Sequence, residues 1–172
     1  GHHQISAVTG LVRVSDCITG ITTQTQAYPA QRVIVAAGAH SLQLLQTANV
    51  QVPLYFTHAE IVETAPLPFE VRTFVMPATN ARIVVENRAT DESEWQQPNH
   101  QVMPPVSFTQ DGLPLLGPVP NSQGLYLFSG FTGPFALVPP TAQHFAKYLV
   151  EGSDTVVEKL LVSRLLPSDK RF

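Results

Sequence analysis

The sequence predicts a mixed α/β fold, and three observations carry this prediction. Short apolar runs of strand length, alternating or β-branched, recur along the chain. One continuous apolar run, residues 32–37, fits a strand buried on both faces, as in a parallel sheet. Residues 142–150 instead carry apolar side chains at helical spacing. Strands and helices are therefore combined in one chain of 172 residues, which is long enough to bury a core.

Predicted strands dominate the first part of the chain. Apolar alternation within residues 5–14 and a β-branched run at residues 18–23 flank a short polar segment, which predicts a β-hairpin. The apolar run 32–37 stops at Gly38. Ser41 then stands where a helix N-cap is expected, just before a leucine-rich stretch, so a short helix should follow.

The middle of the chain also favours strands. Residues 54–63 alternate between two faces, as in a strand of an antiparallel or mixed sheet. Residues 71–75 and 82–85 are two more strand candidates. Nine of the fifteen prolines fall between Pro98 and Pro140, so this stretch is expected to be folded but rich in turns.

The C-terminal part predicts one further strand and a helix. Residues 125–128 have strand composition. Pro139 and Pro140 suit the first turn of a helix, and Gly152 suits its C-terminal cap. The apolar face of this helix is expected to comprise Ala142, Phe145, Ala146, Leu149 and Val150. Residues 156–161 predict a last short helix.

Composition excludes several classes of protein and suggests a hidden interface. A net charge of −3 argues against non-specific nucleic-acid binding, and no apolar run is long enough for a membrane span. A single cysteine, Cys17, excludes an internal disulfide framework. Only 13% of residues are charged, against about 25% in average proteins. We therefore expect part of the surface to be covered, either in a homo-oligomer or by a missing N-terminal segment.

Three segments stand out by composition, and two of them have the pattern of ligand-binding turns. Residues 33–41 place a glycine after a buried strand, and residues 125–140 lead from a strand through a glycine loop into a helix. Glycine permits close approach of a ligand to the backbone, and a helix N-terminus attracts anions. Residues 111–118 form a rigid segment that begins with Asp-Gly, and alone it predicts a loop packed on the core. Ordinary strand-to-helix connections remain the alternative for the two glycine segments.

In this order, the three segments resemble the C-terminal part of the FAD-dependent D-amino-acid oxidase superfamily, which includes glycine oxidase and sarcosine oxidase. The similarity covers residues 8–41 and 109–152, together with the terminal segment ending in Arg171-Phe172. It implies a partial FAD-binding βαβ domain plus part of an antiparallel substrate-domain sheet. Residues 1–50 and 109–172 would belong to the FAD-binding domain, and residues 51–108 to the substrate-binding sheet.

The resemblance also implies site residues. Val8 would lie near the adenine and ribose of FAD, and residues 130–137 would surround the flavin ring. The positions it assigns to the cofactor are Val8, Ala37, Gly38, Gly130, Phe131, Thr132, Gly133, Pro134, Phe135 and Ala136. Tyr55 and Arg72 are candidates for the substrate pocket, and no catalytic residue is assigned.

Several departures from the family pattern bear on activity. The glycine-rich dinucleotide motif of the family's opening strand is absent from this sequence. The segment between Glu86 and Pro105 is shortened, and residues 104–108 hold no arginine to pair with a substrate carboxylate. Pro134 stands where relatives often carry a polar residue. No metal site is expected, because His40, His58, His100 and His144 lack metal-ligand spacing.

The sequence thus predicts an FAD-dependent oxidoreductase that oxidises an amine or amino acid by hydride transfer to flavin. This chain alone is expected to be an incomplete and inactive fragment, with a cytoplasmic location. The alternative is a non-catalytic remnant or interaction module of the same fold that does not bind FAD by itself. Low charge content favours an interface in either case.

Overall fold

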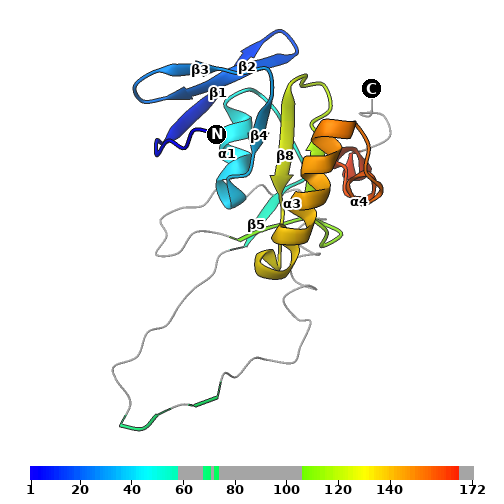
Figure 1. Cartoon of the computed structure of the whole chain (residues 1–172). Helices are drawn as coiled ribbons and strands as arrows, with labels where there is room; N and C mark the ends of the chain where they lie inside the picture. The colour runs from blue at the N-terminus through cyan, green and yellow to red at the C-terminus, as the bar shows by residue number, and fades with distance from the viewer. Residues whose placement is uncertain (58–67, 71, 74–105, 167–172) are drawn as a thin grey trace.

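The computed structural model describes residues 1–57, 68–70, 72–73 and 106–166, and Figure 1 shows their arrangement. The elements, in chain order, are β1 (Val8–Val14), β2 (Cys17–Thr23), β3 (Ala27–Pro29), β4 (Val33–Val35), η1 (Gly38–His40), α1 (Ser41–Gln46), β5 (Tyr55–Thr57), β6 (Val106–Phe108), β7 (Leu115–Pro118), β8 (Leu125–Ser129), α3 (Pro134–Glu151), α4 (Thr155–Lys159) and η2 (Val162–Leu165). The predicted mixed α/β class is confirmed.

The central sheet has the strand order β4-β8-β7. Strands β4 and β8 are parallel, with Val33 opposite Leu125 and Val35 opposite Leu127. Strand β7 pairs with β8 in the antiparallel sense. The pairing of β4 with β8 brings together segments about 90 residues apart in the chain, and it aligns their carboxyl ends at one edge of the sheet.

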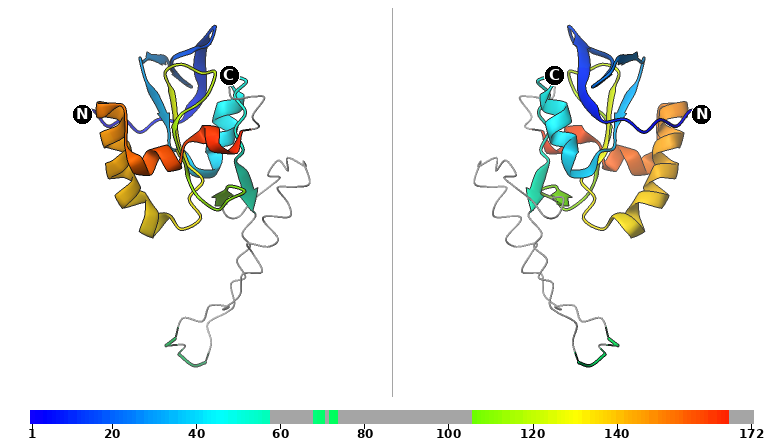
Figure 2. Two further views of the ribbon diagram at one scale, coloured as in Figure 1. Left: turned by 90° about the vertical axis from the view of Figure 1, so that its right-hand side faces the viewer. Right: turned by 90° about the vertical axis from the view of Figure 1, so that its left-hand side faces the viewer.

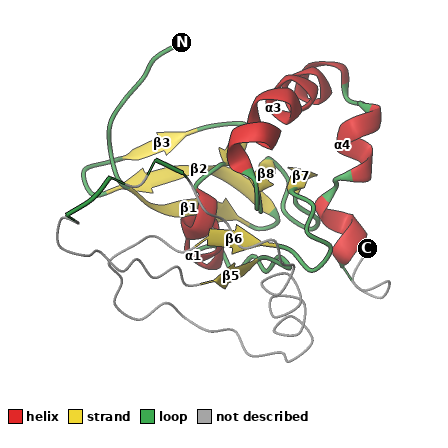
Figure 3. Ribbon diagram, turned by 90° about the horizontal axis from the view of Figure 1, so that it is seen from below, coloured by secondary structure: helices red, strands yellow, loops and turns green. Residues whose placement is uncertain are grey.

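Two smaller sheets flank the central one. Strands β1, β2 and β3 form an antiparallel meander whose first turn is the predicted hairpin. Strands β5 and β6 form a two-stranded antiparallel sheet, seen from below in Figure 3. Within the predicted strand at residues 54–63, Tyr55–Thr57 form β5, and residues 58–63 lie outside the described residues. The strand candidate 82–85 lies outside the described residues, as do residues 71, 74 and 75 of the candidate 71–75, whose described residues 72 and 73 are not in a strand.

The central sheet separates two apolar clusters. Val35, Leu45, Leu125 and Leu127 belong to the cluster shared with α1 and the meander. The cluster on the other face lies beneath α3 and α4. Figure 2 shows α1 and α3 on opposite sides of β8. Both faces of β8 are covered. Its residues therefore alternate between fully and partly buried, and all of them except Ser129 are apolar.

The predicted start of the long helix is wrong. Helix α3 begins at Pro134, so Pro139 and Pro140 lie inside it and not in its first turn. These prolines remove the N–H donors for the carbonyls of Phe135 and Ala136. Both of those residues are exposed, so water can replace the missing donors and the helix can continue.

The predicted apolar face of α3 is also partly wrong. Phe145 is buried, but Val150 is 87% exposed. Thr141 is the other buried residue of this helix. Its hydroxyl donates to the carbonyl of Leu137 at 2.6 Å, so its burial leaves no unpaired polar group.

Two local predictions also need correction. Ser41 is not the N-cap of α1, because the 3₁₀ turn η1 runs directly into the helix and gives Ser41 helical dihedral angles. Residues 111–118 are not all loop, because their second half is strand β7. This apolar segment is a strand because it pairs with β8.

Candidate functional site

The candidate site lies where β4 and β8 end side by side. Gly38 follows β4 and Gly130 follows β8, so both glycines are at the carboxyl edge of the parallel pair. The buried Ser129 hydroxyl donates to the Gly38 carbonyl at 3.2 Å and joins the two turns directly. Ligands of open α/β sheets characteristically bind outside this edge.

The two glycines are required for different reasons. Gly38 has φ of 55°, and a Cβ there would meet no atom within 4 Å, so its exposed backbone borders open space. Gly130 has φ of 80° and is buried. A Cβ at Gly130 would lie 2.9 Å from Thr109 Cγ2 and 3.3 Å from Leu54 Cδ1. Gly38 therefore leaves a surface accessible, whereas Gly130 lets the chain turn against its own core.

The N-terminus of α3 begins four residues after Gly130. Gly133 is its N-cap, with no side-chain capping hydrogen bond, and Pro134 occupies the first helical position. A Cβ at Gly133 would also meet no atom within 4 Å. Phe135 is 97% exposed, and Thr132 and Ala136 are exposed as well. The first N–H groups of this 18-residue helix form a region of positive potential that can interact with negative charge.

Phe131 differs from its neighbours in the same loop. Its side chain is buried and packs against Phe128, with ring centroids 4.8 Å apart. Phe128 in turn packs against Phe145 of α3. The side chain of Phe131 therefore anchors the loop to the core beneath α3, and only its backbone could contribute to a site.

The sheet of β5 and β6 adjoins the same edge. Strand β6 contacts η1, and Leu54 packs at Gly130. The ring of Tyr55 stacks on Phe108 of β6, with centroids 5.7 Å apart and planes at 29°. Ser107 of β6 is buried. Tyr55 thus comes from a strand next to the two glycine turns, as a substrate-pocket residue would require.

The structure does not bring every predicted site residue to this edge. Val8 begins β1, where it pairs with Thr23 in the separate meander. Arg72 is solvent-exposed and forms an ion pair with Glu70, 2.9 Å from Arg72 Nη2 to Glu70 Oε2. Most of the chain around Arg72 lies outside the described residues.

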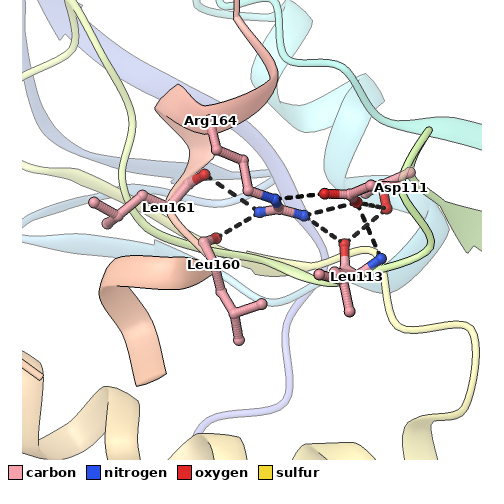
Figure 4. A network of polar contacts seen from close by, with 6 residues as sticks. Asp111, Leu113, Leu160, Leu161 and Arg164 are labelled. Carbon is pink, nitrogen blue, oxygen red and sulfur yellow. Dashed lines mark hydrogen bonds and ion pairs between the residues drawn. The ribbon is translucent and has the colours of Figure 1, made fainter. Parts of the chain in front are cut away.

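An arginine–aspartate network near the site was not foreseen from the sequence. Arg164 Nε and Nη2 donate to the two carboxylate oxygens of Asp111 at 2.7 and 3.0 Å (Figure 4). Burial by itself would raise the pKa of Asp111. Hydrogen bonds from Arg164 and the Leu113 N–H, together with the charge of Arg164, outweigh burial and lower that pKa. Asp111-Gly112 was a turn signal in the sequence, but nothing in it indicated a partner 53 residues away.

Three buried hydroxyl groups near the turns, those of Thr109, Ser41 and Ser129, were not predicted as site residues. Thr109 is 1% exposed and supplies the methyl group beneath Gly130. Ser41, three residues after Gly38, is fully buried, and no hydrogen-bond partner for its Oγ is found among the described residues. A polar residue directly before or after a glycine turn is the signal that could have drawn attention to Ser129 and Ser41.

Metal and membrane features are not found in the part of the chain that the structure describes. No group of three or more His, Cys, Asp or Glu side chains is arranged to hold a metal ion. No described helix combines the length and apolar character needed to cross a bilayer.

The mixed sheet, the parallel β4–β8 pair and the helix that follows β8 together make up a fold that solved structures of glycine oxidase, L-proline dehydrogenase and L-amino acid deaminase share. The resemblance seen in the sequence is therefore confirmed at the level of the fold. No protein-family model matches the sequence. A glycine oxidase from Pseudomonas aeruginosa is 22% identical over an alignment 187 positions long, which covers 91% of this chain and 51% of that protein.

Three solved structures share the fold of this chain. L-proline dehydrogenase from P. horikoshii superimposes with a TM-score of 0.57 at 16% identity, covering 92% of this chain and 53% of its own. L-amino acid deaminase from Proteus vulgaris gives 0.56 at 13% identity, covering 93% and 57%. Glycine oxidase from Geobacillus kaustophilus gives 0.52 at 20% identity, covering 94% and 53%. The chain spans about half the length of the curated glycine oxidase that it matches.

The residues at the carboxyl edge fit a flavin cofactor. Gly38 and Gly133 leave backbone open to a flat ligand, because a Cβ at either would occupy space that no protein atom fills. The α3 N-terminus adds N–H donors without a competing acidic side chain in its first turn. This donor set suits an electron-rich ring that gains negative charge on reduction.

Proposed function

We propose that this chain forms the flavin-facing part of an FAD-dependent oxidoreductase that oxidises an amine or amino acid. The observation that carries the proposal is the junction of the Gly38 and Gly130 turns, held by the hydrogen bond from Ser129 to Gly38 and followed by the open N-terminus of α3. When bound, the flavin would accept a hydride from the substrate carbon next to the amine nitrogen.

The chain's own residues would act mainly through their backbone. The exposed backbone of Ala37, Gly38, Thr132 and Gly133 would approach the cofactor. The N–H groups at the start of α3 would stabilise negative charge on the reduced ring. Apolar Phe135 would limit the access of water. Val8 is part of the meander, so the adenine and ribose that it is expected to contact would lie on that side.

We also propose how the residues of this chain are divided between two domains. Residues 1–50 and 109–172 would make up the FAD-binding part, which is supported by the parallel pairing of β4 with β8. Residues 51–108 would belong to the substrate-binding sheet, with Tyr55 and Arg72 as pocket candidates. Because residues 104–108 contain no arginine, recognition of a substrate carboxylate would need another residue.

A titration of the purified chain with FAD tests the proposal. We expect saturable binding, followed by flavin absorbance and fluorescence. Gly133→Leu should abolish it by filling the open space, while the matched variant Gly133→Ser should retain it with a good helix N-cap. Absence of any saturable binding would contradict the proposal and favour the alternative, an interaction module of the same fold. The mass of the chain in solution then tests whether it forms a homo-oligomer.

A further inference from the structure

Arg164, in the C-terminal turn η2, donates hydrogen bonds to one carboxylate and to three backbone carbonyls. Its Nη2 donates to the Leu113 carbonyl at 2.7 Å, in addition to the bidentate pair with Asp111. Its Nη1 donates to the carbonyls of Leu160 and Leu161 at 2.8 and 3.3 Å. Only 17% of its side chain is exposed. One guanidinium therefore ties the C-terminal turn η2 to the loop between β6 and β7, as Figure 4 shows.

The loop that Arg164 holds is the one that shapes the Gly130 turn. Asp111 Oδ1 accepts hydrogen bonds from the Leu113 N–H and from the Thr109 hydroxyl, both at 3.0 Å. The hydroxyl also lies 2.7 Å from the Leu113 carbonyl, so its single hydrogen is shared between two acceptors. These contacts fix Thr109, whose methyl group occupies the space beneath Gly130. A continuous path of contacts therefore runs from Arg164 through Asp111 and Thr109 to the glycine turn.

We propose that Arg164 is a positioning residue for the Gly130 turn, and that it sets the conformation of residues 129–137 without touching a ligand. The role for cofactor binding rests on the proposed function, but the effect on the turn does not. Arginine is required because its planar fork can engage both carboxylate oxygens and three carbonyls at once. Lysine could hold only part of this set.

The test compares variants of Arg164 with a matched arginine. Arg13 also pairs with an aspartate, Asp16, and donates to the carbonyls of Ser15, Ala48 and Asn121, but it lies on the meander. Hydrogen exchange is measured by mass spectrometry in Arg164→Met, Arg164→Lys and Arg13→Met. We expect exchange of residues 129–137 to accelerate about tenfold in Arg164→Met and less in Arg164→Lys, with no such change in Arg13→Met.

The comparison separates positioning from a general loss of stability. Exchange rates are compared at equal distance below each variant's melting temperature. Acceleration spread evenly over the whole chain, or equal acceleration of residues 129–137 in Arg13→Met, would overturn the proposal. Arg164→Lys keeps the test usable if Arg164→Met does not fold. Adding Asp111→Asn to Arg164→Met should accelerate the exchange of residues 129–137 little further, because both changes break the same path of contacts.

The cofactor readout is kept separate. FAD affinity is measured first in the wild-type chain. An affinity about tenfold lower in Arg164→Met, with the wild-type affinity retained in Arg13→Met, would support the proposal. Failure of the wild type to bind FAD would contradict the proposed function only, since the exchange experiment still decides the role of Arg164. Normal exchange in Arg164→Met would contradict the positioning role, whatever the FAD result.

Discussion

The two ends of β8 use glycine in the same conformation but for different purposes. Gly124, before the strand, has φ of 77°, and Gly130, after it, has φ of 80°. A Cβ at Gly124 would lie 2.8 and 2.9 Å from the backbone carbonyl oxygens of Ile18 and Gln31. A Cβ at Gly130 would meet side chains, from Thr109 and Leu54. Gly124 therefore holds three stretches of backbone together, whereas Gly130 packs against side-chain methyl groups.

The surroundings of the two ends also differ. At the amino end, the backbone is closed by hydrogen bonds such as Val33 N–H to the Gly124 carbonyl and Ile18 N–H to the Gln123 carbonyl, each 2.8 Å. A shallow hollow of about 590 Å³ is found there, but its lining, which includes Cys17 and Gln123, has no charged side chain. At the carboxyl end, open glycine backbone meets a helix N-terminus. Similar glycines thus serve the fold at one end and the candidate site at the other.

Gly124→Ala should have the largest effect on stability. The new methyl group would combine an unfavourable positive φ with collision against backbone, which cannot move aside. We expect a loss of about 3 kcal/mol in the free energy of unfolding, measured by urea denaturation. A loss below about 1 kcal/mol would show that the amino end is not as tightly packed as described.

Gly130→Ala should destabilise less but act more selectively. The same backbone strain applies, but the atoms nearest to the new methyl group are side-chain methyl groups of Thr109 and Leu54 and not backbone carbonyl oxygens. We expect a loss of about 2 kcal/mol, together with loss of FAD binding by the molecules that remain folded. Equal FAD affinity in Gly130→Ala and the wild type would contradict a functional role for this turn.

Asp154 provides a pH-dependent test of the fold away from the site. Its side chain accepts hydrogen bonds from the N–H groups of Val156 and Val157 and lies 3.0 Å from His144 Nδ1. The hydrogen bond that Asp154 accepts from His144 and those it accepts from the backbone lower the pKa of Asp154, against the opposing effect of burial. A lowered pKa in the folded state means that this stabilisation is complete above the unfolded pKa of about 4 and is lost as pH falls through the folded value.

The measurement for Asp154 is the melting temperature between pH 7 and pH 2.5. Asp154→Asn keeps a good N-cap but cannot ionise, so its melting temperature should fall less steeply below about pH 4 than that of the wild type. Asp111→Asn is the companion variant, because the pKa of Asp111 is lowered as well. Parallel curves for Asp154→Asn and the wild type would show that the ionised carboxylate of Asp154 does not stabilise the fold.

Phe135→Ser should have the smallest effect on stability. The ring is almost fully exposed, so its removal should change the free energy of unfolding by less than about 0.5 kcal/mol, while weakening FAD binding. A larger loss of stability, dependent on protein concentration, would instead show that Phe135 is covered in a homo-oligomer.

The sequence was informative where the signal is local. The hairpin of β1 and β2, the apolar strand β4 and the glycine loop after β8 were predicted because alternation and glycine placement are properties of neighbouring residues. Resemblance to a family supplied what local signals could not, namely the expectation that the segments around Gly38 and Gly130 lie together, and the hydrogen bond from Ser129 to Gly38 joins them. The start of α3 was misplaced because two adjacent prolines are usually a first-turn signal.

Contacts between distant residues could not be predicted in this way. The pairing of Asp111 with Arg164 and the packing of Thr109 beneath Gly130 depend on the tertiary fold, and nothing in the sequence around Arg164 or Thr109 indicates these contacts. Strand β7 was missed for the same reason, since its apolar residues become a strand only beside β8. Local patterns therefore located the turns, whereas the structure identified what holds them in place.

Mapping FAD on the wild-type chain by hydrogen exchange tests the contrast between the two ends most directly. The chain is exchanged with and without saturating FAD, and protection is measured along the sequence. We expect protection of residues 36–40 and 129–137, with residues 16–19 and 121–124 at the amino end unchanged. Protection confined to the amino end, or none anywhere, would contradict the claim that the carboxyl ends of β4 and β8 form the functional site.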